Sequence, residues 1–147
     1  MLFAGIDPGA RGGIAVIHDC GTVVLTHPCD YGFYASVIGR YKPNEVLITV
    51  ESVHAMPGQG VTSMFSFGEG FGKIQGICLA FGHEIKKVEP RKWKGFYGLS
   101  KDKWESITLA QRLFPTANLL PTPRCKKMSD GMAEALLIAE YGRKHLQ

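Results

Sequence analysis

Residues 45–51 (Glu-Val-Leu-Ile-Thr-Val-Glu) form an apolar run with almost no polar alternation. A strand of this kind is buried on both faces, as in the centre of a sheet that carries helices on each side. The chain has 147 residues, enough for one domain with a hydrophobic core and too few for two. We therefore expect a single α/β domain over residues 1–147, built around a mixed sheet.

The other elements follow from turn residues and apolar spacing. Short apolar runs between turns predict further strands at 2–6, 14–17, 22–26 and 84–88. The first three are joined by tight glycine turns, which predict an antiparallel meander. Apolar residues at helical spacing predict helices at 31–39, 63–81, 102–114 and 130–145. Strands that alternate with helices after an antiparallel start are typical of a mixed sheet covered by helices.

The composition excludes several classes of protein. Apolar residues make up 45% and charged residues 20%, as in a globular protein and unlike a disordered, collagen-like or coiled-coil chain. No apolar run reaches the ~20 residues that span a bilayer, and the first residues lack the basic region of a signal peptide. We therefore expect a cytoplasmic protein without a membrane partner. The four cysteines lie far apart with no C-x-x-C pair, which predicts free thiols.

Charge is distributed unevenly along the chain. Residues 1–85 carry a net charge of −3 and residues 86–147 a net charge of +7. A basic half favours a polyanionic partner, above all nucleic acid, although solvated surface lysines are the alternative. Trp93, Phe96 and Tyr97 interleave with these cations, which suits stacking on exposed bases and equally a core anchor for a short turn. The candidate DNA-binding cations of this half are Arg91, Lys92, Lys94, Lys101, Lys103, Arg124, Lys126 and Lys127.

Two acidic residues close apolar strands. Asp7 follows the run at 2–6, and Glu51 ends the run at 45–51. Ligand sites of open α/β sheets lie outside the carboxyl ends of the strands, where a buried acid is costly unless it is paired or holds a cation. An exposed strand-end acid is common for either residue alone, but the two together favour a cation site.

A second pair of acids opens the last predicted helix. Asp130 and Glu134 are four residues apart and share a helix face that continues through Leu137 and Tyr141. Like charges on a buried face repel each other and resist desolvation, and a divalent cation resolves both problems. Acids favoured at a helix start, with Ser129 as cap, are the alternative, which explains the first acid better than the second. Four carboxylates suit two Mg²⁺ or Mn²⁺ ions, which can cleave a phosphodiester, so the set predicts a metal-dependent nuclease.

Three features recur together in one family: residues 5–9 (Gly-Ile-Asp-Pro-Gly), the strand-final Glu51, and residues 130–139 (Asp-Gly-Met-Ala-Glu-Ala-Leu-Leu-Ile-Ala). In these the chain resembles the RuvC-like Holliday-junction resolvases, most of all the small phage-type members. The resemblance follows the order of elements and of acids over nearly the whole chain. It implies a ribonuclease H-like fold, in which a five-stranded mixed sheet with three antiparallel strands first is flanked by helices.

The same resemblance implies an activity. Members of the family are homodimers that bind a four-way DNA junction and nick two opposing strands symmetrically, leaving 5′-phosphate and 3′-hydroxyl ends. The implied catalytic and metal-binding set is Asp7, Glu51, Asp130 and Glu134. Bacterial members space the last two acids three residues apart, whereas this chain spaces them four apart, as in a variant branch.

A looser match covers residues 88–94 (Val-Glu-Pro-Arg-Lys-Trp-Lys) and Lys103. It resembles the family segment whose lysines lie beside the scissile phosphate, and it implies catalytic roles for Lys94 and Lys103, with Lys101 as a substitute for Lys103. An ammonium group there would offset charge that develops on the phosphate. A lysine-rich surface turn is the alternative.

Two further roles are implied by position in the family. The loop after Glu51 lies where family members probe the junction centre, which makes His54 a candidate DNA-binding residue. The helix at 63–81 resembles dimer-interface material. Its glycines would allow close approach of a partner or of the sheet, and they are Gly68, Gly70, Gly72 and Gly76.

Other functions fit the same residues. A ribonuclease H-fold nuclease with a broader branched-DNA or RNA-containing substrate would use the same four acids. A non-catalytic junction-binding protein on this fold is a further alternative, although it would not need all four.

Overall fold

The computed structural model describes residues 1–52 and 54–146. Its sheet has five strands in the order β3-β2-β1-β4-β5. Strands β1, β2 and β3 form the antiparallel meander, and β4 and β5 continue the sheet in parallel with β1. The bounds are Leu2–Asp7, Gly13–His18, Val23–Pro28, Val46–Glu51 and Ile85–Val88. The expected mixed sheet is therefore confirmed, with β4 in its interior between β1 and β5.

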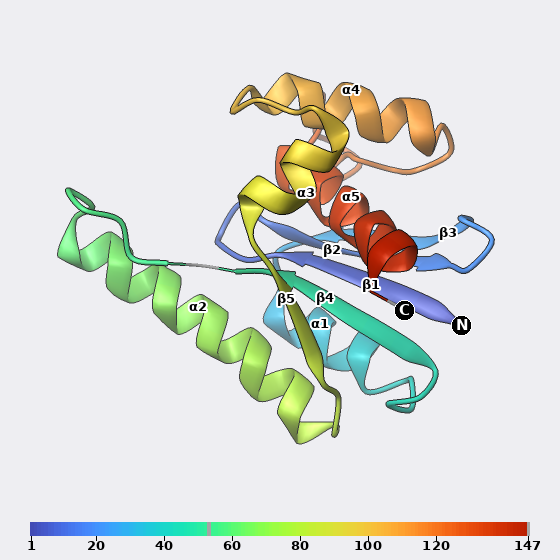
Figure 1. Ribbon diagram of the computed structural model, residues 1–147, viewed down its shortest axis with the longest axis horizontal. Helices are drawn as coiled ribbons and strands as arrows, with labels where there is room; N and C mark the ends of the chain where they lie inside the picture. The colour runs from blue at the N-terminus through green and yellow to red at the C-terminus, as the bar shows by residue number, and fades with distance from the viewer. Residues whose placement is uncertain (53, 147) are drawn as a thin grey trace.

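In residues 1–52 and 54–146, five helices cover the two faces of the sheet (Figure 1). Their bounds are Tyr31–Ile38 for α1, Val61–Ala80 for α2, Pro90–Tyr97 for α3, Lys103–Leu113 for α4 and Asp130–His145 for α5. Alternate strand residues point to opposite faces. Phe3, Ala15 and Ile17 pack in a core with α3, α4 and α5. Ala4, Ile14 and Val16 pack in the other core, with α1 and α2.

The sequence pattern missed α3. Pro90 ends β5 as expected, but it also stands in the first turn of a helix, where its fixed φ and missing N–H do no harm. Gly98 ends this helix in the left-handed conformation, with φ 67°. The interval between the last sheet strand and α4 is therefore a helix and not a turn. Helix α2 also begins at Val61, inside the segment expected to be a loop.

Close packing fixes α5 against the central strand β1. A Cβ atom at Gly5 would collide with the carbonyl oxygen of Ala135 and the amide nitrogen of Ala139. Only glycine on the strand and small residues on the helix allow this approach. The start of α5 is thereby held beside the end of β1, where Asp7 lies.

The lengths of the helices and the state of the cysteines can also be compared with the sequence. Within the described ranges, the helices are all too short or too polar to cross a membrane. The four cysteines carry free thiols.

Candidate active site

Neighbouring parallel strands bring the first two acids together. Ile6 of β1 lies opposite Val50 of β4, so Asp7 and Glu51 follow at the same edge of the sheet. Burial raises the pKa of Asp7 well above its ordinary value, and the charges of Glu134 and Glu51 raise it further. Burial also raises the pKa of Glu51, against a hydrogen bond that lowers it. Asp7 is therefore subject to repulsion from neighbouring carboxylates, in a region where solvation is poor.

Helix α5 supplies the second pair of acids from its first two turns. The Ser129 hydroxyl accepts a hydrogen bond from the Met132 N–H and caps the helix start. Asp7, Asp130 and Glu134 together line a cavity of about 360 Å³. We call this the catalytic cavity, after the role that we propose for it. It brings together three of the four predicted acids, and Glu51 lies beside them at the strand end.

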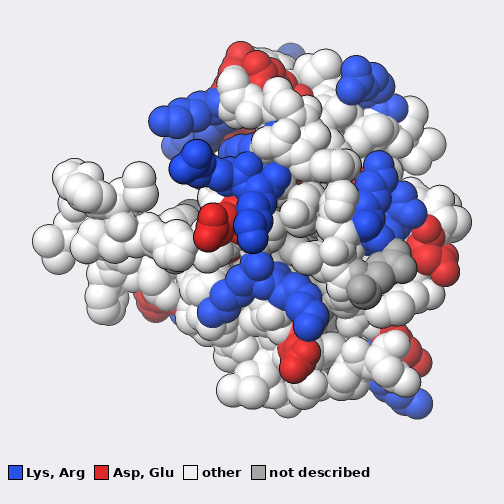
Figure 2. All heavy atoms as spheres, viewed as in Figure 1, with Lys and Arg blue, Asp and Glu red and all other residues white. Residues whose placement is uncertain are grey.

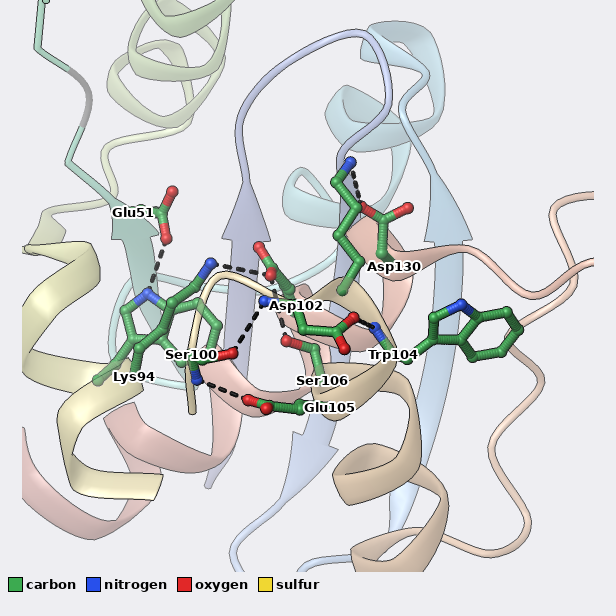
Figure 3. Close-up of polar contacts among 11 residues, drawn as sticks. Glu51, Lys94, Ser100, Asp102, Trp104, Glu105, Ser106 and Asp130 are labelled. Atoms are coloured by element: carbon green, nitrogen blue, oxygen red, sulfur yellow. Dashed lines mark hydrogen bonds and ion pairs between the residues drawn. The ribbon is translucent and has the colours of Figure 1, made fainter. Parts of the chain in front are cut away.

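Cations balance the carboxylates (Figure 3). Lys94 Nζ lies 2.9 Å from Glu134 Oε1, and Lys103 Nζ lies 2.7 Å from Asp130 Oδ2. The hydroxyl of Ser106, on α4, donates a further hydrogen bond to Glu134 Oε1 at 3.2 Å. The hydrogen bond to Asp130 raises the pKa of Lys103. Both lysines singled out in the sequence thus reach the acids, and Lys101 lines the same cavity.

Trp93 holds the fourth carboxylate. Its indole is fully buried, as expected for a core anchor, and its Nε1–H donates to Glu51 Oε2 at 2.7 Å. The Lys94 ammonium lies 5.1 Å from the centre of the same ring. Phe96 and Tyr97 lie elsewhere, with Phe96 in contact with Tyr97 and His145. The aromatic residues of α3 therefore divide between the site and a separate cluster.

The donor set fits a hard divalent cation. In the described part of the chain, no group of three or more His, Cys, Asp or Glu side chains is arranged to hold a metal ion with its side chains as they stand. Each of the three partnered carboxylates is instead turned to a side chain of α3 or α4. Asp7 remains half-buried among three like charges that raise its pKa, a position that a cation relieves. Carboxylate oxygens are the ligands that Mg²⁺ and Mn²⁺ prefer, so Asp7, Glu51, Asp130 and Glu134 could hold such ions.

The other predicted DNA-binding residues are all exposed. Arg91 and Lys92 lie on α3, and Figure 2 shows lysine and arginine side chains gathered over the side of the molecule where α3 and β5 lie. Lys127 lines a hollow next to the catalytic cavity. Arg124 and Lys126 belong to the same loop before α5.

His54 lies apart from this group. It lines a smaller hollow of about 160 Å³ with residues of α2, and its ring lies 3.3 Å from the Ser52 hydroxyl. Phe67 lines both this hollow and the catalytic cavity. The two places are therefore adjacent but distinct.

Sequence reasoning missed two lining residues, Arg11 and Phe67. Arg11 is one of four basic residues in the acidic half, and it stands in the glycine turn directly after Asp7, which was a usable signal. Phe67 reaches the cavity from α2, and its place in a helical apolar pattern gave no indication of this.

The strand order and the acids at its rim define an α/β fold of the ribonuclease H-like class. No family model matches the sequence, and no curated protein matches it. RuvC of T. thermophilus, solved in complex with Holliday junction substrate, has a TM-score of 0.70 and 16% identity, with 99% of this chain and 97% of that chain covered. A second Thermus thermophilus RuvC structure has a TM-score of 0.58 and 18% identity, with 98% and 96% covered. The chain therefore has the fold of RuvC along nearly its whole length, which confirms the fold that the resemblance implied.

Burial makes Asp7 a destabilising charge in the metal-free protein. In the folded state the pKa of Asp7 is raised above its ordinary value of 3.8. At pH values between 3.8 and that raised pKa, the folded state binds more protons than the unfolded state, so the free energy of unfolding falls as the pH rises. We expect Asp7→Asn to remove this fall and to unfold at a higher temperature than the parent protein near neutral pH in EDTA. Thermal melts from pH 4 to pH 8 measure the difference, and Mg²⁺ should stabilise the parent more than the variant.

Asp19 is the matched control, because its pKa is lowered by the N-terminal amino group and not raised by burial. Asp19→Asn should therefore give no stabilisation near neutral pH. An Asp7→Asn protein less stable than its parent at pH 7 in EDTA would contradict the argument.

Trp93 should keep Glu51 ionised. Trp93→Phe preserves the ring and removes the N–H, so the pKa of Glu51 should rise further, and the free energy of unfolding should fall by about 1–3 kcal/mol. Carboxyl ¹³C NMR titration follows Glu51, whose resonance is assigned through Glu51→Gln. Trp104→Phe, at an exposed tryptophan, is the control and should leave that pKa in place. An unchanged Glu51 titration in Trp93→Phe would show that the indole N–H has no such role.

Proposed function

We propose that this chain is a metal-dependent, structure-selective endonuclease that resolves four-way DNA junctions by paired symmetric nicks, leaving 5′-phosphate and 3′-hydroxyl ends. The gathering of Asp7, Asp130 and Glu134 in one cavity, with Glu51 beside them, carries the proposal. The fold supports it, because a protein of the same fold has been solved in complex with Holliday junction substrate.

Two Mg²⁺ ions, or Mn²⁺ ions, would be held by Asp7, Glu51, Asp130 and Glu134. When bound, such ions activate a water molecule and stabilise the leaving oxygen of a phosphodiester. The buried acids support this assignment, since Asp7 lies among like charges that otherwise have to be neutralised by protons or by lysines.

The chain's own cations would bind the phosphate. Lys94 and Lys103 line the cavity, and their ammonium groups can donate to phosphate oxygens that enter it. Their positive charge offsets the charge that develops on the phosphate as it is attacked. Lys101 adds a third cation at the same wall.

A labelled synthetic junction tests the activity. Purified protein with Mg²⁺ should produce paired symmetric nicks on the four-way junction and leave matched duplex, flap and RNA–DNA hybrid intact. EDTA and Asp7→Asn should each abolish cleavage, and Lys94→Met should slow it by roughly 10²-fold. Glu84→Gln, at an exposed acid remote from the cavity, is the control.

Equal cutting of flaps would widen the activity to branched DNA in general. Cutting of the hybrid, or tight junction binding without cleavage in either metal, would contradict the proposal.

We also propose that the chain acts as a homodimer, because paired nicks need two active sites on one junction. Helix α2 supports a dimer through an uncovered apolar stripe. Val61, Phe65 and Leu79 are 81%, 74% and 79% exposed. Between them a Cβ atom would meet open space at Gly68, Gly72 and Gly76, whereas Gly70 faces Tyr31 within the fold. The start of α2 projects from the molecule (Figure 1) and carries no charged residue from 54 to 68. A second copy packed on this stripe would bury it.

Phe65→Asp should separate the subunits. It places a charge in the stripe without disturbing the core, so light scattering should show 16.1 kDa monomers where the parent protein forms dimers. The variant should lose paired nicks while each site keeps its carboxylates. Val24→Asp, at a half-exposed valine on β3, is the control. A monomeric parent protein that still makes paired nicks would contradict the dimer.

A further inference from the structure

The catalytic cavity is the middle of a longer channel. On one side it shares Ala10, Arg11 and Asp130 with a hollow of about 320 Å³ that continues to Lys127. On the other side it shares Lys94 and Lys101 with a hollow of about 370 Å³ that continues to Arg91. Because neighbouring hollows share lining residues, the three adjoin one another in a row, which we call the channel, with the carboxylates in its middle hollow and cations in the hollows on both sides.

The cations of this channel are not equivalent. Lys94 and Lys103 each form an ion pair with a carboxylate. Arg11, by contrast, has no side-chain hydrogen bond or ion pair with any residue in 1–52 or 54–146. Its charge even opposes the protonation of Lys103, so the two cations repel each other across the cavity. A guanidinium placed in this way lacks an anion.

The backbone under Arg11 is firmly held. The Gly12 N–H donates to the Gly9 carbonyl at 3.0 Å, and the Gly12 carbonyl accepts from the Cys29 N–H at 3.1 Å. On the other side, the carbonyl of Arg11 lies against Gly131 in the first turn of α5, where a Cβ atom would collide with it. A guanidinium on a fixed turn loses less freedom on binding and presents its planar donors to a phosphate in two parallel hydrogen bonds.

We infer that Arg11 binds a backbone phosphate of the cleaved strand next to the scissile one, with Lys127 following it along the channel. The inference rests on the proposed function, because the cut defines which phosphate is next to it. Arg91 and Lys101 line the opposite arm of the channel. The strand therefore crosses the carboxylates while its phosphates are held on both sides of the cut.

The test pairs Arg11 with single phosphates. One strand of a four-way junction carries a single uncharged methylphosphonate in place of one phosphate. The replaced phosphate is in turn each of the two that precede the cut and each of the two that follow it. Binding is measured by fluorescence anisotropy in EDTA, and cleavage is measured under single-turnover conditions in Mg²⁺. Arg11→Ala should weaken binding of the unmodified junction about tenfold, and Arg11→Lys should recover only part of this loss.

The expected signature is non-additivity at one position. There the methylphosphonate should weaken binding by the parent protein but cause almost no further loss in Arg11→Ala. At the other positions the two losses should add. The slope of log affinity against log salt concentration should also be shallower in Arg11→Ala, by about the amount that one phosphate contact contributes. Arg40→Ala, at an exposed arginine whose guanidinium donates a hydrogen bond to Ser36 on α1, should bind and cut as the parent does.

The outcomes separate the two proposals. If the parent protein cuts the junction in pairs and the losses add at every position, Arg11 does not bind a phosphate near the cut, and the nuclease assignment stands. If the parent protein neither binds nor cuts the junction, the proposed function fails, and the phosphate site fails with it.

Discussion

The close approach of α5 to β1 is the contact on which the rest of the site depends. Gly5 leaves no space for a side chain, and Ala135 and Ala139 present only small groups to it. This contact sets the distance between α5 and β1. At the start of α5, Gly131 packs in the same way against the backbone of the turn after β1. Asp130 and Glu134 therefore reach Asp7 as a result of backbone packing along the whole helix. A residue larger than glycine at position 5 would push α5 outward and displace its acids, although it would not touch the carboxylates themselves.

This packing has an electrostatic cost. It gathers four carboxylates where solvent is scarce, and the cost is visible in the raised pKa of Asp7 and Glu51. The compensating groups come from α3 and α4, the helices that cover α5. Lys94 and Trp93 belong to α3, and Lys103 and Ser106 belong to α4. These two helices thus complete the hydrophobic core and also supply the donors that make a metal-free site tolerable. A cation in the site would free the same lysines for a phosphate.

The sequence predicted what depends on local pattern. Strand ends, helix periods and the order of the acids are properties of short segments, so Asp7, Glu51 and the start of α5 could be placed from the order of residues alone. Helix α3 could not, because Pro90 marks the end of a strand and the first turn of a helix equally well. For Trp93 the sequence left a core anchor and base stacking as alternatives, and the hydrogen bond of this residue to Glu51 depends on how α3 lies over the sheet. Phe67 reaches the cavity only through tertiary packing, whereas Arg11 stands in the turn after Asp7 but in the half of the chain where the net charge is negative.

The channel also bears on substrate shape. Its hollows are each a few hundred cubic ångströms, a scale that suits the backbone of a single strand. On the proposed function, we expect the cleaved strand to part from its helical partner between Arg91 and Lys127. That deformation costs least next to a branch point, where stacking is already interrupted. Selectivity for branched DNA then arises from the energy needed to bring a strand into the channel, and the carboxylates act on whichever phosphate the flanking cations hold between them. On the proposed function, shape selection and catalysis are therefore separate tasks of one surface, carried by different residues.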